Sequence, residues 1–262
     1  MPQTLEQRTE GPVRHLCLNR PALHNAFDAE LIEALTTALE AAGCDASVRV
    51  VVIEGAGVSF SAGADLQWMR GMAAASEEDN RRDALALARL MRTLDELPKP
   101  TLARVHGAAF GGGVGLVACC DIAIGVPEAR FGLTESRLGL LPAVISPYVI
   151  AAIGARQARR WFATAEMFDA ARALHIGLLH EVVDSAALDA AVQRQIELLL
   201  KAGPLSTAGA KALVARVFRE PDSAMHDAVN AALIARLRVS PEGQEGISAF
   251  LEKRAPSWQP AA

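Results

Sequence analysis

The chain has 262 residues, of which 51% are hydrophobic and 21% charged, and its net charge is −4. This length allows a large buried core without disulfides, and the slight acidity with few aromatic residues argues against an extended nucleic-acid-binding surface. No apolar run reaches the thickness of a bilayer, the N-terminal segment has no apolar signal region, and the four cysteines form no CxxC pair. We therefore expect a cytoplasmic protein with reduced thiols and with no membrane or nucleic-acid partner.

Hydrophobic periodicity in the first half of the chain predicts strands that alternate with helices. Asp28 is a good N-cap for the first helix, which Gly43 is expected to end. A long helix is predicted over 76–97, and the segment 67–75 before it is expected to be short and mobile. Apolar or β-branched runs predict strands at 13–19, 48–53, 101–105 and 121–126. This order predicts an α/β layered core with parallel strand pairing.

The second half of the chain is expected to be mainly helical. The predicted elements are an extended segment at 129–133, a turn at 134–137, helices at 145–153, 157–164 and 170–174, and a short strand at 182–183. Further helices are predicted at 186–202, 205–218 and 223–238, with a last one after Ser240-Pro241. Because these tail helices are too apolar to stand alone in water, we expect them to cover the core or a neighbouring subunit.

Two loops of small residues follow predicted strands. Residues 105–116 hold five glycines in twelve residues without a carboxylate or lysine, and Ala62-Gly63-Ala64 follows the strand at 48–53. Glycine lets the backbone approach a partner closely, and the first N–H groups of a helix are unpaired. If the two strands are neighbours, such N–H groups can converge on one oxygen as an oxyanion hole. A phosphate cradle or a plain turn would give the same pattern.

Few side chains near these loops suit catalysis. The serines have no GxSxG context, the cysteines have no motif partner, and the six histidines lack metal-ligand spacing, so we predict no metal site. Proton transfer beside an enolate then needs a carboxylate in an apolar pocket, and Glu135 is the candidate. A solvated glutamate in the first turn of a helix would fit the same sequence. Asp65 fits a helix cap better than a base.

Several motifs follow one another along nearly the whole chain. They are Asn19-Arg20-Pro21 with Asn25-Ala26, residues 60–66 (FSAGADL), Lys99-Pro100, residues 107–121, Phe131-Gly132 with Glu135, and residues 248–254 (SAFLEKR). In this order and spacing they resemble the crotonase (enoyl-CoA hydratase/isomerase) superfamily. The resemblance implies an α/β fold, a crotonase-like spiral of ββα turns, over residues 1–203. Residues 204–262 would form a C-terminal helical trimerisation region that covers the site and builds a homotrimer or a hexamer (dimer of trimers).

The resemblance also implies a site for an acyl-CoA thioester, with no cofactor because coenzyme A is part of the substrate. By position, the backbone N–H groups of Ala64 and Gly112 would hold the thioester oxygen, and Glu135 would be the catalytic acid or base. The residues that would contact substrate or CoA are Leu23, His24, Ala26, Ala62, Asp65, Leu66, Gly111, Phe250 and Lys253, the last two from the tail or across a subunit interface. The residues that would line the acyl pocket are Trp68, Met69, Gly115, Arg137 and Tyr148. Packing of the helix explains Trp68 and Met69 as well, and a surface salt bridge explains Arg137 as well.

One position departs from the family pattern. Hydratases of this family carry a first catalytic glutamate where this chain has Gly115, and residues 143–148 (AVISPY) replace a glycine-rich run. We expect that a glutamate at position 115 would clash with its surroundings. With residues 64–70 (ADLQWMR) and 238–246 (RVSPEGQEG), these departures resemble bacterial 3-methylglutaconyl-CoA and isohexenylglutaconyl-CoA hydratases.

The implied function is that of a hydro-lyase that adds water to an α,β-unsaturated acyl-CoA. The expected substrate is 3-methylglutaconyl-CoA or a related branched glutaconyl-CoA, whose second carboxylate Arg137 could pair. A lone glutamate also suits a Δ3–Δ2 enoyl-CoA isomerase, because that reaction needs one proton shuttle beside the oxyanion hole. A non-catalytic acyl-CoA-binding protein is the alternative from another class.

Overall fold

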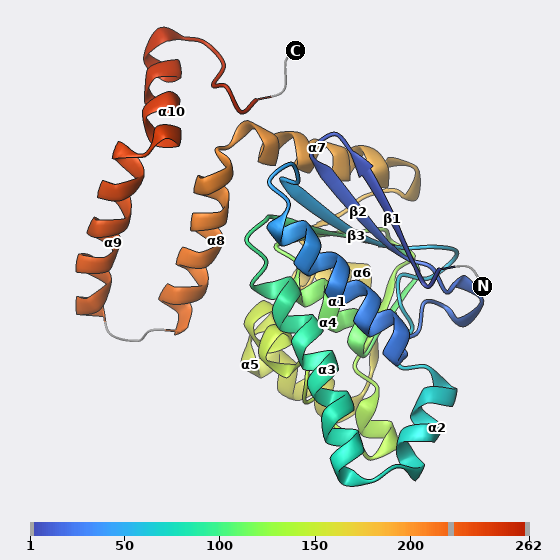
Figure 1. Cartoon of the computed structure of the whole chain (residues 1–262). Helices are drawn as coiled ribbons and strands as arrows, with labels where there is room; N and C mark the ends of the chain where they lie inside the picture. Colours follow the sequence, from blue (N-terminus) through green and yellow to red (C-terminus); the bar gives the residue numbers. More distant parts are fainter. Residues whose placement is uncertain (1–2, 220–222, 260–262) are drawn as a thin grey trace.

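Two β-sheets organise the chain (Figure 1). The computed structural model describes residues 3–219 and 223–259. The main sheet has the strand order β1-β2-β3-β4-β6-β9, and the smaller sheet has the order β5-β7-β8. Their bounds are β1 (Leu5–Glu10), β2 (Val13–Leu18), β3 (Val50–Gly55), β4 (Thr101–Val105), β5 (Ala108–Phe110), β6 (Ile122–Gly125), β7 (Arg130–Gly132), β8 (Met167–Asp169) and β9 (Glu181–Val182).

The main sheet is parallel from β2 to β9, as the alternation of strands and helices predicted, but β1 pairs with β2 in antiparallel orientation. The sequence pattern missed β1. Leu5 is the one buried side chain of that strand, so its polar residues carry no hydrophobic alternation. Backbone hydrogen bonds to β2 define this edge strand instead.

Helices pack around both sheets. Helix α1 contacts β1 and β2, α7 contacts β3, β4 and β6, and the almost wholly buried α4 lies against α3 and α5. The α-helices are α1 (Ala29–Cys44), α2 (Leu66–Ala74), α3 (Glu77–Asp95), α4 (Gly112–Cys119), α5 (Ser146–Thr164), α6 (Ala170–His175), α7 (Leu188–Lys201), α8 (Pro204–Arg219), α9 (Ser223–Val239) and α10 (Pro241–Glu252). The 3-10 turns are η1 (Pro21–Leu23), η2 (Glu135–Leu138) and η3 (Ser185–Ala187).

Local chemistry sets most helix boundaries. Asp28 caps α1, as predicted, because its side chain accepts a hydrogen bond from the Leu31 N–H. The prediction that Gly43 ends this helix was wrong, since α1 continues to Cys44. The two helices predicted at 145–153 and 157–164 form α5, which is interrupted at Gly154 with a φ of +77°. Strands β5 and β8 were not predicted, because three-residue strands are too short to show a period.

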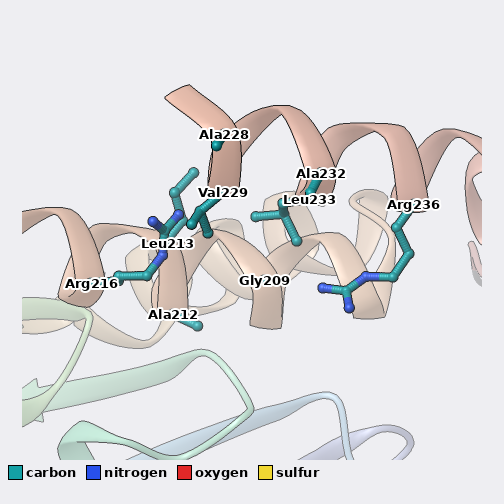
Figure 2. A pocket seen from close by; sticks show the side chains of 9 residues that line it. All are labelled: Gly209, Ala212, Leu213, Arg216, Ala228, Val229, Ala232, Leu233 and Arg236. Atoms are coloured by element: carbon teal, nitrogen blue, oxygen red, sulfur yellow. The ribbon is translucent and has the colours of Figure 1, made fainter. Parts of the chain in front are cut away.

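The predicted tail helices are present and stand at one side of the molecule, with α9 and α10 farther from the sheets than α8 (Figure 1). A shallow apolar pocket between α8 and α9 is lined by residues that include Leu213, Val229 and Leu233 (Figure 2). Lys211 of α8 reaches the Asp121 carboxylate at 2.9 Å. Beyond α10, the Trp258 carbonyl accepts a hydrogen bond of 2.7 Å from Arg49, the residue that precedes β3. The tail therefore lies at the amino edge of the parallel strands.

Large apolar side chains on the tail helices remain exposed to solvent in the single chain. They include Val214, Phe218, Val239, Phe250 and Leu251. The expectation that the tail covers the chain's own core is therefore met only in part, by α8 and by the segment beyond α10.

Membrane insertion finds no support among the helices. None of those in the described residues combines the length and the hydropathy that a transmembrane span requires.

The loops at the carboxyl edge of β3 and β4 depend on a glycine at a position where a side chain would be strongly disfavoured. Gly107 has a φ of +59°, and a Cβ added to it would lie 1.9 Å from the Val58 carbonyl oxygen. We predict that Gly107→Ala lowers the free energy of unfolding by about 1–2 kcal/mol for the left-handed backbone, plus about 1–3 kcal/mol for the overpacked contact. Urea unfolding of the purified variant measures this loss.

Gly11→Ala is the matched control, because Gly11 has a φ of +55° but nothing within 4 Å of the added Cβ. It should show the backbone cost alone. Equal losses in the two variants would contradict the close approach of the two loops.

Candidate active site

The two loops of small residues lie side by side at the carboxyl edge of the sheet, as expected for neighbouring parallel strands. The Ser61 N–H donates to the Ala108 carbonyl at 3.0 Å, and the Phe110 N–H donates to the Ser61 carbonyl at 2.9 Å. Gly63 has a φ of +86°, and a Cβ there would lie 2.9 Å from the Phe110 carbonyl oxygen. The residues that precede Ala64 and Gly112 are therefore in direct backbone contact.

Ala64 presents a backbone N–H that has no acceptor among the described residues. The hydrogen bonds of its neighbours fix its orientation: the Phe27 N–H donates to the Gly63 carbonyl at 2.7 Å, and the Asp65 N–H donates to the Phe27 carbonyl at 2.9 Å. Ala64 itself is exposed. Since buried N–H groups in folded proteins are nearly always paired, a fixed and accessible unpaired one is suited to a ligand oxygen.

Gly112 begins α4 and presents a second such N–H, again without an acceptor in the part of the chain that the structure describes. The Gly111 N–H donates to the Gly132 carbonyl at 2.9 Å, and the Gly115 N–H donates to the Gly111 carbonyl at 3.1 Å. As the first residue of a helix, Gly112 also lies at the positive end of the helix dipole. The arrangement suits a developing negative charge on a carbonyl oxygen.

The Glu135 carboxyl group lies directly against the glycine loop. Its Oε1 atom is 3.0 Å from the point at which a Cβ on Gly111 would stand. Its Oε2 atom is buried and has no hydrogen-bond partner among the residues that the structure describes. Burial raises the pKa of Glu135, although a hydrogen bond from its own backbone N–H opposes the rise. A half-buried carboxyl with a raised pKa and a free oxygen is suited to proton transfer near neutral pH.

The residues predicted to contact CoA from the N-terminal half surround the Ala64 loop. The Ala62 N–H donates to the His24 carbonyl at 2.9 Å, so these two loops touch. Leu23 and Leu66 are largely exposed there, and the His24 ring contacts the Ser59 hydroxyl at 3.0 Å. This surface is open to a ligand.

Two residues of that group have their side chains buried in the protein. Ala26 is 6% exposed, and its carbonyl accepts a hydrogen bond from Arg20. Asp65 caps α2 through the Gln67 and Trp68 N–H groups and pairs with Arg20 at 3.0 Å. Burial raises the Asp65 pKa, but these hydrogen bonds outweigh burial and lower it overall. The cap assignment is confirmed, and the Asp65 side chain is occupied within the protein.

An isoleucine occupies the space beside Gly115. A Cβ added at position 115 would lie 2.4 Å from Ile145 Cγ2 and 3.1 Å from Met91 Cε. The sequence analysis did not single out Ile145, whose position became clear only from the packing of α4 against α5. This contact confirms that a glutamate at position 115 would clash.

The other residues predicted for the acyl pocket are spread over three elements. Trp68 and Met69 are half-buried on α2, and Arg137 is exposed on η2, two residues after Glu135. Tyr148 lies on α5, where burial raises its pKa to about 12 and the neighbouring Cys119 contributes. Cys119 ends α4, whereas Gly112 begins it, so Tyr148 lies near the far end of that helix.

Phe250 and Lys253 do not meet the site within one chain. They belong to α10 and its C-cap at the amino edge of the strands, whereas Ala64 and Gly112 lie at the carboxyl edge. Phe250 is 82% exposed. The tail of one chain therefore leaves that chain's own site uncovered.

A metal site is absent from the described residues, where no three His, Cys, Asp or Glu side chains cluster closely enough to bind an ion.

Comparison with known proteins covers nearly the whole chain. The profile of the family described as enoyl-CoA hydratase/isomerase matches residues 8–261. The structure of an enoyl-CoA hydratase from Shewanella pealeana is 45% identical with a TM-score of 0.95, over 97% of this chain and 96% of that one. The structure of Pseudomonas aeruginosa AtuE is 37% identical with a TM-score of 0.94, over 98% and 100% of the two chains.

A 2,3-dehydroadipyl-CoA hydratase of Escherichia coli is 34% identical over 93% of this chain and 94% of its own length. The sequence motifs, the two paired loops and these matches agree. The chain has the crotonase fold and belongs to the enoyl-CoA hydratase/isomerase family.

Proposed function

We propose that the protein adds water across the double bond of an α,β-unsaturated acyl-CoA thioester. The observation that carries this proposal is the pair of N–H groups at Ala64 and Gly112, which have no acceptor among the described residues, beside the Glu135 carboxyl, whose buried Oε2 atom has no partner there. Family membership supports the thioester as substrate. Coenzyme A enters as part of that substrate, so the proposal needs no separate cofactor.

The two N–H groups stabilise charge on the thioester oxygen. As the water oxygen bonds to Cβ, the electrons of the double bond move toward that oxygen and form an enolate. An N–H of this kind contributes about 2.7–4 kcal/mol of transition-state stabilisation in a known hydrolase. The helix dipole at Gly112 adds to this stabilisation, because the oxygen gains negative charge as the reaction proceeds.

Glu135 carries the proton in this mechanism. Its carboxylate takes a proton from water while the C–O bond forms, and the resulting carboxylic acid returns a proton to Cα of the enolate. The raised pKa of Glu135 suits both steps, because it makes the carboxylate a stronger acceptor for the water proton and leaves the carboxylic acid able to donate to the enolate. Ile145 beside Gly115 leaves no room for a second acid at that position.

The finer part of the proposal is a substrate with a second carboxylate, such as 3-methylglutaconyl-CoA or another branched glutaconyl-CoA. Arg137 lies within one turn of Glu135 and has no ion pair among the described residues. A guanidinium binds a carboxylate in bidentate fashion. The name of the 2,3-dehydroadipyl-CoA hydratase relative also denotes an acyl group that ends in a carboxylate.

Assembly into a homotrimer or a dimer of trimers is part of the same proposal. Phe250 and Lys253 are remote from their own chain's site, so a second copy would have to bring them to it. Exposed apolar side chains on α8, α9 and α10 supply surface for such contacts.

Isomerisation of a 3-enoyl-CoA to a 2-enoyl-CoA is the second candidate. The Gly115–Ile145 contact favours it, because it excludes a second acid at position 115 and the isomerase reaction needs only one carboxyl. Incubation in H2-18O separates the two reactions. A hydratase incorporates the label into product from a 2-enoyl-CoA, whereas an isomerase converts a 3-enoyl-CoA without incorporation. Binding of acyl-CoA without turnover of either compound would indicate a binding protein.

Glu135→Gln tests the proton carrier. We predict that it lowers kcat/KM for a 2-enoyl-CoA by at least about 100-fold, the smaller end of general acid–base effects. In the wild type, kcat/KM should rise with pH through the raised pKa of Glu135, and the variant should lose this dependence. Glu128→Gln, at an exposed glutamate, is the control and should leave the profile unchanged.

Thermal unfolding shows whether the Glu135→Gln variant is correctly folded. Because the folded-state pKa of Glu135 is raised, ionisation destabilises the wild type as pH increases from the unfolded-state pKa to the folded-state pKa. The glutamine variant should therefore match or exceed the wild-type Tm at pH 7. Near wild-type turnover by a folded glutamine variant would refute the mechanism.

Gly115 and Ile145 should be energetically coupled. We predict that Gly115→Ala destabilises the wild type by about 1–3 kcal/mol through overpacking, but destabilises an Ile145→Ala background clearly less. Ile145→Ala removes the Cγ2 atom that the new Cβ would meet. A urea-unfolding cycle over the four proteins measures the coupling, and additive losses would show that Ile145 does not occupy this space.

Arg137→Gln tests the second carboxylate of the substrate. We predict a loss in kcat/KM of about 10- to 100-fold for 3-methylglutaconyl-CoA, as for one lost hydrogen bond to a charged group, and little change for crotonyl-CoA. Arg159→Gln, at another exposed arginine, is the matched control. Equal losses on both substrates would exclude carboxylate recognition by Arg137.

A further inference from the structure

Helix α2 is held at both ends by polar contacts, and its half-buried Trp68 packs against the hydrophobic core. It contains no buried residue. At its start, the Asp65 carboxylate accepts from two backbone N–H groups of the first turn. Near its end, the Asn80 side chain donates to the Met72 carbonyl at 2.7 Å. The segment expected to be short and mobile thus forms a helix with polar contacts at both ends, and its mobility stays a prediction. Removal of a single polar contact should loosen it.

A side-chain hydrogen bond between helices supplies the third contact. The indole Nε1–H of Trp68 donates to Oδ1 of Asp83 on α3 at 3.1 Å. Both residues are half-buried, and Asp83 has no ion pair among the described residues. Burial raises the pKa of Asp83, and the indole hydrogen bond partly offsets that rise. Burial of a carboxylate costs free energy when its only partner is a neutral donor. A side chain that served packing alone would not need this charge.

Asp83 lies on the face of α3 that turns toward Gly115. The spacing of four residues places Asp83, Leu87 and Met91 along one side of the helix. Met91 is buried, and its Cε atom is 3.1 Å from a Cβ built on Gly115. The Trp68–Asp83 bond therefore joins α2 to the side of α3 that also carries Met91, the residue beside Gly115.

The chain runs from Ala64 through Asp65 directly into α2. The Asp65 N–H donates to the Phe27 carbonyl at this junction, so a displacement of α2 would strain that hydrogen bond and, with it, the Ala64 peptide whose orientation the bond helps to fix. Hydrogen bonds at an oxyanion depend strongly on direction, so a small rotation lowers the rate. The far end of this linkage is the side chain of Asp83.

We propose that Asp83 is a positioning residue that acts through Trp68 to hold α2 and the Ala64 N–H in the orientation required by the thioester oxygen. This inference rests on the proposed function of the Ala64 and Gly112 loops. Asp83 does not transfer a proton in this account. Its role is that of a fixed acceptor for the indole N–H.

The expected kinetic signature is a loss in kcat rather than a rise in KM. An oxyanion donor acts mainly on charge that develops in the transition state, so a misdirected donor slows the reaction more than it weakens binding. Asp83→Ala and Trp68→Phe should each lower kcat on crotonyl-CoA about tenfold, the effect of one hydrogen bond to a charged group. The double variant should lose no more than either single one, because both remove the same bond.

Two further variants separate positioning from other roles. Asp83→Asn keeps a carbonyl oxygen for the indole and should retain most of the wild-type kcat. Arg89→Gln breaks the surface pair between α3 and Glu40, whose atoms are 2.7 Å apart, and should leave kcat unchanged. An Asp83→Asn variant as impaired as Asp83→Ala, or losses that add in the double variant, would overturn the proposal.

Fluorescence keeps this test separate from the proposed reaction. The chain has three tryptophans, so Trp161→Phe with Trp258→Phe leaves Trp68 as the reporter. Butyryl-CoA, which has no double bond to hydrate, should change the Trp68 emission with Asp83 present, and change it less with Asp83→Ala. If the wild type turns over no enoyl-CoA but the emission response still differs between the wild type and Asp83→Ala, the proposed function is refuted, whereas the coupling of Asp83 to Trp68 is supported. If the wild type hydrates the enoyl-CoA but Asp83→Ala changes neither kcat nor the Trp68 emission response, the positioning role of Asp83 is refuted.

Discussion

Two backbone N–H groups that have no acceptor among the described residues are the constraint on which the site depends. Ala64 and Gly112 are held by their neighbours' hydrogen bonds, so their own donors cannot turn inward to find partners. The adjacency of β3 and β4 brings the two loops together, and glycine makes the close backbone contacts sterically feasible at Gly63 and Gly107. The fold thereby leaves hydrogen-bonding capacity for a ligand to satisfy.

The Glu135 carboxyl beside this donor pair is the group proposed to transfer the proton. Glu135 is placed by the turn η2 and lacks a partner for one buried oxygen, which favours its neutral form and raises its pKa. At position 115, where relatives in the family carry a glutamate, Ile145 occupies the space beside Gly115, so the surroundings there are apolar. In the proposed reaction, the site would combine two donors for the carbonyl oxygen with Glu135 as the proton carrier, a combination that suits enolate chemistry.

Local signals in the sequence predicted much of this arrangement. The strand positions and the Asp28 and Asp65 caps follow from short-range patterns, whereas the place of Glu135 beside the glycines was one of two interpretations until the family resemblance favoured it. Features that depend on packing between distant segments could not be predicted from such local patterns. Ile145 meets Gly115 only after α5 folds against α4, and Asp83 is one polar residue in a long helix until Trp68 reaches it. The edge strand β1 gave no pattern because its side chains face solvent.

The most direct measurement is a crystal structure of the Glu135→Gln variant with a bound 2-enoyl-CoA. The account predicts that the thioester oxygen lies about 2.7–3.1 Å from both the Ala64 and Gly112 nitrogens, with the substituted side chain at position 135 facing Cα. A thioester oxygen bound elsewhere, with both N–H groups directed at solvent, would contradict the central claim.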